Sequence, residues 1–358
     1  MTPSILFAAT QHGSFNLIYP LLEKCLQKYD VGYVGVKKIV HDKLLLNRTI
    51  ESEYDNIDIL ALNVFDLFLT GTSPTSEIEY NMWKYAKSKG KRSIVVLDSS
   101  KYAADRFCKR GIMCVPDIIC VADHQVKETL QAIVSEKSII TVTGSPYFDN
   151  IDRFKISDTE RLYIRAKRGI ANKKMIMFCT EYIAKMDEKE RYGFDEISIL
   201  NDLLKYIDMR GKHRFRLAIR LHPNDSKEIY ESYMNSMGHD IEWEIIIEDA
   251  DRKLFQLSDV IVGMTSLILV DAVILGIPSI SYQPTNAITK IMEYRSMANI
   301  ELAVTREELF SFMDNILLYD GFKKSERHMY LYANSVERIM GIIESSVFES
   351  NKEACQQG

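Results

Sequence analysis

The sequence predicts an α/β protein made of two domains, each a parallel sheet with helices on both faces. Three observations predict this. The chain has 358 residues, which suits two domains better than one. Short apolar runs rich in β-branched residues alternate with helical patterns throughout. The strands are apolar on both faces, as in sheets that helices cover on both sides.

Strand and helix patterns alternate through residues 1–150, the expected N-terminal domain. Pro20 has no N–H and therefore fits only near the first turn of the first helix. Gly90 ends the second helix. The expected strands are 4–9, 31–36, a run within 58–71, 92–98, 117–123 and 139–144, and the expected helices are 15–30, 76–90 and 124–136.

The same alternation restarts after a charged interval, 150–174, and fills residues 151–348, the expected C-terminal domain. Residues 349–358 are expected to be a disordered tail. The last expected helix, 324–345, carries an apolar stripe of Tyr330, Val336, Ile339, Met340 and Ile343. The expected strands are 175–180, 215–223, 242–249, 260–264 and 278–283, and the other expected helices are 194–209, 227–237, 251–258 and 266–276.

Composition and motifs exclude several classes of function. A net charge of −5 and a pI near 5.9 argue against a nucleic-acid-binding protein. The six cysteines form no CxxC pair, which predicts reduced thiols and a cytoplasmic location. No signal peptide or membrane span is evident. No P-loop, GxGxxG or HExxH motif occurs, so we expect neither a cofactor nor a metal.

A polar cluster follows one expected strand of the second half. Arg220, His222, Pro223 and Asn224 come just past the apolar run 215–219. In open parallel sheets, ligands bind beyond the carboxyl ends of the strands. The cluster therefore marks a ligand site, or else it caps the next helix and forms a surface ion pair.

A second stretch, some forty residues later, favours the ligand site. After the strand 260–264, the chain turns through Gly263, Thr265 and Ser266 into a helix. Hydroxyls and unpaired N–H groups at a helix N-terminus form an anion site, for which phosphate is the usual occupant. The alternative is an ordinary Ser/Thr cap.

These motifs resemble the C-terminal half of GT-B glycosyltransferases and their relatives. In the sugar-nucleotide 2-epimerases, a segment similar to 258–281 runs from a strand through a Ser/Gly turn to a helix with an acid and then LGxP. Leu275–Pro278 matches that end, and Asp271 falls where these relatives place a ribose-binding acid. Residues 142–149 look like the crossover between the family's domains. The resemblance implies two Rossmann-like domains facing across a cleft, with the C-terminal helix packing back.

The His-Pro pair followed by a Thr-Ser pair is also similar to bacterial sialyltransferases and capsule Kdo transferases. The resemblance implies that His222 contacts the donor phosphate and protonates or shields the leaving group, while Thr265 and Ser266 bind phosphate oxygens. The paired-acid-plus-glycine motif of the sialyltransferases is not evident, nor are the GTRPE, EAGLR and acidic-pair motifs of the epimerases. The expected donor site comprises Arg220, His222, Pro223, Gly263, Thr265, Ser266 and Asp271.

The N-terminal half offers candidates for the catalytic base and the acceptor side. Thr10, Gly13 and Ser14 lie in the loop after the first strand, where many GT-B enzymes carry such groups. His12, in the same loop, is either the base or a residue that only satisfies a turn. Asp98, at the end of another strand, is either a base or a helix cap.

The expected function is metal-independent transfer of a sugar from a CMP- or UDP-linked donor to a bacterial surface glycan or glycoconjugate. The alternatives are a sugar-nucleotide 2-epimerase or hydrolase, a CDP-polyol phosphotransferase on the same scaffold, and an inactive nucleotide-sugar-binding protein. The expected partners are the donor and a glycan or lipid-linked acceptor, with no nucleic acid. Contact with the inner face of the membrane is expected to be weak and peripheral at most, and a homodimer stays open.

Overall fold

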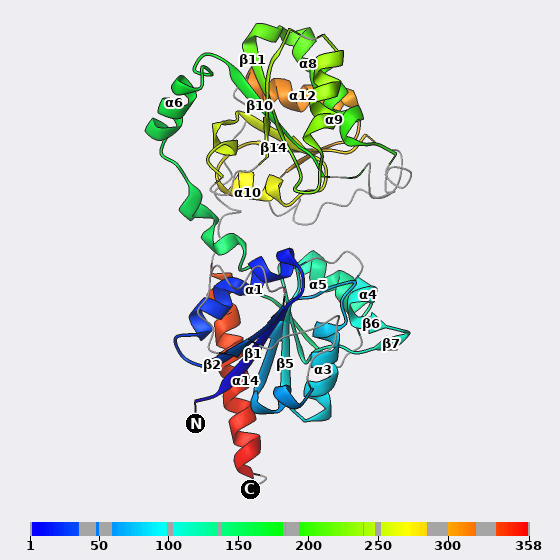
Figure 1. Cartoon of the computed structure of the whole chain (residues 1–358), viewed down its shortest axis with the longest axis vertical. Coiled ribbons are helices and arrows are strands. Elements are labelled where there is room, and N and C mark those ends of the chain that lie inside the picture. The colour runs from blue at the N-terminus through cyan, green and yellow to red at the C-terminus, as the bar shows by residue number, and fades with distance from the viewer. Residues whose placement is uncertain are drawn as a thin grey trace. The chain divides into compact units, whose positions relative to one another are not determined.

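The computed structural model describes residues 2–35, 48–49, 59–98, 103–134, 138–181, 183, 193–238, 240–247, 252–284, 300–319 and 334–356. The chain forms two compact units, and each contains a sheet flanked by helices (Figure 1). Unit 1 is Met1–Asp149 together with Leu331–Gly358, and unit 2 is Asn150–Tyr330. None of the described helices is long and apolar enough to cross a membrane.

Unit 1 is built on a seven-stranded sheet in the order β3-β2-β1-β4-β5-β8-β9, in which all neighbours are parallel. Its strands are β1 (Ser4–Ala9), β2 (Asp30–Gly35), β3 (Arg48–Thr49), β4 (Leu67–Thr70), β5 (Arg92–Val96), β8 (Ile118–Val121) and β9 (Ile139–Val142). Its helices are α1 (His12–Cys25), η1 (Ile59–Val64), α3 (Ile78–Ser88), α4 (Ala103–Phe107), α5 (His124–Gln131) and α14 (Ser335–Gln356). A hairpin joins β6 (Cys108–Lys109) to β7 (Ile112–Met113), and η2 (Phe148–Phe154) leads into unit 2.

The central strands of unit 1 are buried on both faces, which explains their continuous apolar sequence. Ile5 and Phe7 pack against α1 and α14, whereas Leu6 and Ala8 pack toward α3 and η1. Since β2 and β4 flank β1 on opposite sides, the strand order reverses there. The carboxyl ends of β1 and β4 therefore form the point where such a sheet binds ligands.

Helix α1 begins three residues earlier than expected, and our placement of its proline was wrong. Pro20 lies in the interior of His12–Cys25 rather than in its first turn. A proline inside a helix removes one N–H···O bond and crowds the preceding turn. Burial of the apolar face, including Leu17 and Leu21, offsets this cost.

Unit 2 repeats the same architecture with a six-stranded parallel sheet in the order β12-β11-β10-β13-β14-β15. Its strand order reverses at β10, which β11 and β13 flank. The strands are β10 (Lys174–Cys179), β11 (Phe215–Arg220), β12 (Glu242–Ile246), β13 (Val260–Gly263), β14 (Ser279–Tyr282) and β15 (Glu301–Ala303). The helices are α6 (Asp158–Lys167), α8 (Glu196–Arg210), η4 (Lys212–Arg214), α9 (Lys227–Ser236), η5 (Phe255–Leu257), α10 (Ile268–Ile274) and α12 (Arg306–Leu317).

Four elements of unit 2, namely α6, η4, β15 and α12, were not expected from the sequence. Helix α12 had a recognisable start signal, because Thr305 and Glu308 form a reciprocal capping box. Helix α6 lies within the charged interval, and the Ser157 side chain caps it by accepting the N–H of Glu160. The expected helix 251–258 is reduced to the short turn η5.

The C-terminal helix α14 packs back as expected, but on unit 1 rather than within the predicted domain 151–348. Ile339 and Ile343 are fully buried in the same core as α1. Lys28, in the turn after α1, forms an ion pair at 2.8 Å with Glu344 of α14. The helix continues to Gln356, so most of the expected disordered tail is helical. Tyr330 of the predicted stripe lies outside the described residues.

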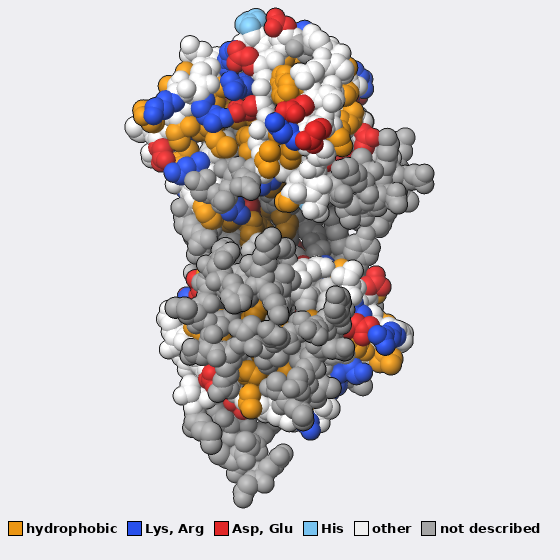
Figure 2. Space-filling view, in the orientation of Figure 1, with side chains coloured by type: hydrophobic (Ala, Val, Ile, Leu, Met, Phe, Trp, Pro, Cys, Tyr) orange, Lys and Arg blue, Asp and Glu red, His pale blue; other side chains and the backbone are white. Residues whose placement is uncertain are grey.

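Charged side chains of both signs are scattered over the part of unit 2 that the space-filling view displays. In Figure 2, Lys and Arg are interspersed there with Asp and Glu, among hydrophobic and other side chains.

Candidate functional site

The two reversal points of strand order each carry polar side chains at the carboxyl ends of the strands. In unit 2, Glu181 follows β10 after a single residue, and Met264, Thr265 and Ser266 follow β13 directly. Because β10 and β13 are neighbours, these two loops meet.

Glu181 binds the turn after β13 through both carboxylate oxygens. Its Oε1 accepts the backbone N–H groups of Met264 at 2.8 Å, Thr265 at 2.6 Å and Ser266 at 2.8 Å. Its Oε2 accepts the Thr265 hydroxyl at 2.6 Å. Converging N–H groups of this kind form an anion-binding concavity. We call Met264–Ser266 the anion cradle.

Burial raises the pKa of Glu181 above its ordinary value, although the four hydrogen bonds act in the opposite direction. The loss of hydration on burial therefore outweighs the hydrogen bonds and disfavours the charged form of this carboxyl. Glu181 was missed in the sequence, although an acid directly after the strand 175–180 was a usable signal.

Neighbouring residues hold the cradle in shape. The Met264 carbonyl accepts the Ser281 hydroxyl at 2.5 Å and the Gln283 side-chain amide at 3.2 Å. A Cβ on Gly263 would approach the Leu269 side chain to 3.2 Å, so a small residue suits this position. Helix α10 begins at Ile268, two residues beyond the Thr265–Ser266 pair.

The predicted His-Pro loop lies on the adjacent strand and is tied to the segment that carries Glu181. The His222 backbone N–H donates to the Thr180 hydroxyl at 2.8 Å. The Nδ1 atom of His222 accepts the Asn224 N–H at 3.2 Å, which places the proton of a neutral imidazole on Nε2. Pro223 and Asn224 are exposed.

Arg220 ends β11, and its Nε is buried without a hydrogen-bond partner among the described residues. A buried guanidinium donor that lacks a partner favours an anionic ligand. The position of Arg220 beside the end of β10 places this donor near the Glu181 loop.

Asp271, the predicted ribose ligand, is only 2% exposed and forms an ion pair with Arg252. The distance between Arg252 Nε and Asp271 Oδ2 is 3.1 Å. The Arg252 guanidinium also lies over the Phe154 ring, 4.6 Å from its centre. A contact between Asp271 and ribose stays a prediction. It would have to form beside the ion pair between Asp271 and Arg252 or replace that ion pair.

In unit 1, Asp98 is held by two side chains at the carboxyl edge of the sheet. Its Oδ1 accepts Arg106 Nη1 at 2.7 Å and the Thr72 hydroxyl at 2.5 Å. Arg106 is 5% exposed and also donates to Thr72 at 2.6 Å. A Cβ on Gly13 would lie 3.7 Å from Asp98 Oδ2, so the first loop passes close to this carboxylate.

The loop after β1 is fixed by a buried acid that the sequence analysis missed. Glu79 Oε1 accepts the backbone N–H of Thr10 at 2.9 Å and its hydroxyl at 2.6 Å. Glu79 is 1% exposed, and its Oε2 has no hydrogen-bond partner within the described ranges. Burial raises the pKa of this carboxyl. Ser14, also buried, donates to the Thr72 carbonyl at 2.6 Å. His12 begins α1, and its side chain lies outside the described part.

A buried ammonium group also adjoins this edge of unit 1. Lys109, in the β6–β7 hairpin, donates to the carbonyls of Ser73 at 3.3 Å and Pro74 at 2.6 Å. Burial lowers the pKa of Lys109. Its contacts hold the 71–77 loop, so it supports the site rather than adding an open donor.

No protein-family model matches the chain, and no curated protein sequence does. Solved structures nevertheless share its fold over nearly the whole chain. The UDP-GlcNAc 2-epimerase of Methanocaldococcus jannaschii is 14% identical, with a TM-score of 0.66 over 96% of this chain and 100% of that one. Anabaena HepE, in complex with UDP and glucose, is 10% identical, with a TM-score of 0.64 over 99% of each chain. S. aureus MnaA, solved with UDP, is 14% identical, with a TM-score of 0.61 over 96% of each.

At these identities the likeness establishes the fold. The chain has the two Rossmann-like α/β domains of the GT-B fold, as the sequence predicted. The resemblance to the 2-epimerases is confirmed at the level of structure.

Proposed function

We propose that the protein binds a uridine diphosphate sugar in unit 2 and acts on the sugar as a 2-epimerase or a hydrolase. The observation that carries the proposal is the anion cradle, in which three N–H groups and a hydroxyl already hold a carboxylate. The fold neighbours support the choice of nucleotide, because several were solved with UDP or UDP-GlcNAc.

A donor phosphate would occupy the cradle only after Glu181 leaves it. Both groups present anionic oxygens to the same N–H donors, so they compete directly. Phosphate carries more oxygens and can also use the orphaned Nε of Arg220. The raised pKa of Glu181 shows that its charged form is poorly solvated in the cradle, and displacement returns the carboxylate toward water.

Epimerisation at C2 breaks and re-forms the C2–H bond, so one group must take the proton and another must return it to the opposite face. Because no carbonyl adjoins C2, loss of the proton is coupled to cleavage of the C1–O bond, with UDP as the leaving group. UDP adds back to C1 when the proton returns to C2. We assign the base to Asp98, whose position Arg106 and Thr72 fix. His12 stays the second candidate. His222 is proposed to stabilise the charge that develops on the nucleotide phosphate.

Sugar transfer, our first expectation, has weaker support. The acceptor side was expected to use Thr10 and Ser14, but the structure engages both hydroxyls internally. Thr10 donates to Glu79, and Ser14 is fully buried against Thr72. An acceptor alcohol would therefore find few free donors on this loop, whereas epimerisation and hydrolysis need no second sugar.

Incubation with UDP-GlcNAc in D2O, followed by proton NMR and mass spectrometry, tests the proposal. A new epimer with deuterium at C2 indicates an epimerase, whereas free sugar and UDP indicate a hydrolase. The Asp98→Asn variant should abolish either product, and Asp105→Asn, on α4 next to Arg106, is the control. If the protein binds and turns over only CMP-sugars with an acceptor, the proposal is wrong and transfer is correct.

A further inference from the structure

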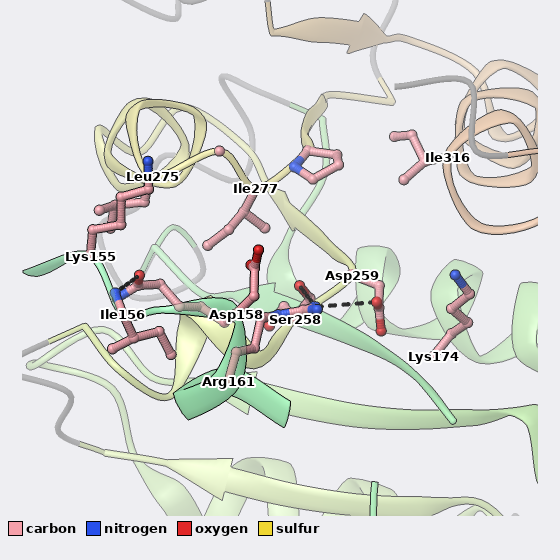
Figure 3. Close-up of a pocket in the computed structure, with 13 residues that line it drawn as sticks. Lys155, Ile156, Asp158, Arg161, Lys174, Ser258, Asp259, Leu275, Ile277 and Ile316 are labelled. Carbon is pink, nitrogen blue, oxygen red and sulfur yellow. Dashed lines mark hydrogen bonds and ion pairs between the residues drawn. The ribbon is translucent and has the colours of Figure 1, made fainter. Parts of the chain in front are cut away.

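Unit 2 contains a pocket at the edge of its sheet opposite to the anion cradle. Its volume is about 300 Å³. It is lined by Lys174 at the start of β10, by Asp259 just before β13 and by Pro278 just before β14 (Figure 3). These are the amino ends of strands, so the pocket is separate from the site described above. Its volume is at the lower end of the range for small-molecule sites.

The floor of the pocket contains a buried hydroxyl without a partner. Ser258 is 2% exposed, and its Oγ forms no hydrogen bond within the described ranges. Nearly all buried polar atoms of proteins have a partner, in the protein, in water or in a ligand. Gln256 beside it is fully used, since its amide donates to the carbonyls of Phe154 and Arg252 and accepts the Ile156 N–H. The Ser258 hydroxyl is thus a donor or acceptor available to a ligand.

The rim of the pocket carries an excess of positive charge. Lys155 is exposed and forms no ion pair with the described residues. Lys174 lines the pocket at another point and has an interaction of its own. Figure 3 shows these two lysines on opposite sides of the view, with Ser258 between them. Asp259 is shared by Arg161 at 3.3 Å and Arg165 at 3.0 Å, so it does not neutralise both guanidinium groups.

The remaining wall is apolar. Leu275 and Ile277 are 5% and 6% exposed, and Pro278, Ile156 and Ile316 complete this surface. An apolar wall with a few convergent polar groups is the usual composition of a small-molecule site. Asp158 at the rim is exposed and is the one acid of the lining besides Asp259.

We propose that this pocket binds a small organic anion with a compact apolar body. The body would lie against Leu275, Ile277 and Ile316. A carboxylate or phosphate would face Lys155 and accept the Ser258 hydroxyl. The proposal does not depend on the nucleotide-sugar function, because it concerns other residues at the opposite edge of the sheet.

Binding of three matched probes to the full chain tests the site. Phenyl phosphate and benzoate carry the two anionic groups, and benzyl alcohol has the same ring without charge. We expect phenyl phosphate or benzoate to bind more tightly than benzyl alcohol in a titration followed by NMR, and the better anion identifies the ligand class. Excess UDP should not displace either anion.

Two variants and a control locate the binding. Ser258→Ala should lower the affinity for the anion about fivefold, which is the effect of one lost hydrogen bond, without lowering the melting temperature. Lys155→Gln should lower the affinity for the anion about threefold and leave the affinity for benzyl alcohol unchanged. Lys227→Gln, on α9 and outside the pocket, should change nothing. Equal affinity for all three probes, or unchanged anion affinity in both pocket variants, would overturn the proposal.

Discussion

The Glu181 carboxylate accepts the backbone N–H of Ser266 at 2.8 Å, from a residue 85 positions away in the chain. The same oxygen accepts the N–H groups of Met264 and Thr265. The turn that the sequence predicted to bind phosphate is therefore occupied by an anion of the protein itself. Under the proposed function, Glu181 and the nucleotide compete for one set of donors.

Replacement of Glu181 by Ala should strengthen the binding of UDP and lower the stability of the ligand-free protein. The loss leaves three partly buried N–H groups without their acceptor, which costs about 1–3 kcal/mol of unfolding free energy. Calorimetric titration with UDP and with pyrophosphate measures the first effect, and chemical unfolding measures the second.

The titration with pyrophosphate distinguishes a site for phosphate alone from a site for the whole nucleotide. If the Glu181→Ala variant binds pyrophosphate more tightly but UDP with unchanged affinity, the cradle is a phosphate site and does not bind the nucleotide. Weaker binding of both ligands in the Glu181→Ala variant would show that Glu181 supports the ligand rather than competing with it.

His222→Ala should lower turnover more than it weakens UDP binding, because charge on the leaving group develops in the transition state. The stability of the free protein should change by about 1 kcal/mol or less, since the imidazole accepts one exposed N–H. His213→Ala, an exposed histidine of η4, is the matched control. Unfolding of the His222→Ala variant with normal activity per folded molecule would identify the imidazole as a structural cap.

Ser266→Ala should weaken UDP binding by about 1 kcal/mol, as for one ordinary hydrogen bond. Among the described residues, its hydroxyl accepts only the Ile268 N–H, over a long distance of 3.4 Å, so its loss should leave the ligand-free melting temperature nearly unchanged. Titration calorimetry and a thermal melt of the same sample measure both. An unaltered UDP affinity would place the phosphate away from this hydroxyl.

Glu79→Gln should change how stability depends on pH. Because burial raises the pKa of Glu79 above its ordinary 4.5, the folded state keeps this proton to higher pH than the unfolded chain does. The wild-type protein therefore loses stability as the pH rises through that interval. The variant lacks this titration, so its stability relative to wild type should increase from pH 4 to neutral pH. Urea unfolding across the range checks the sign, with the exposed Glu301→Gln as control.

Ile339→Ala should destabilise unit 1 selectively. The side chain is fully buried in the core shared by α1 and α14, and such truncations cost about 2–5 kcal/mol. Hydrogen exchange should show faster opening of β1 and β2, with the amides of β10 and β11 unchanged. Equal loss of protection in unit 2 would contradict the assignment of α14 to unit 1.

Most strands and helices could be predicted from the sequence because their signals are local. The apolar runs at 4–9 and 175–180 became β1 and β10 almost residue for residue. Helix α12 could also have been predicted, because Thr305 and Glu308, which form its capping box, are a local signal in the sequence. Pro20 was a different case. The local rule that proline is excluded from a helix interior was outweighed by burial of the apolar face of α1.

The sequence by itself determined two parallel α/β sheets and placed Thr265, Ser266, His222 and Asp98 at strand ends. Only the tertiary structure decided what those residues contact. Glu181 meets Thr265 because β10 and β13 are neighbours in the sheet. The local sequence of neither strand determines which strand lies beside it. In the same way, the apolar stripe of α14 predicted that the helix would be buried. The complementary face of α1, more than 300 residues earlier, decided which unit buries it, because hydrophobic burial is non-directional and selects a partner by shape.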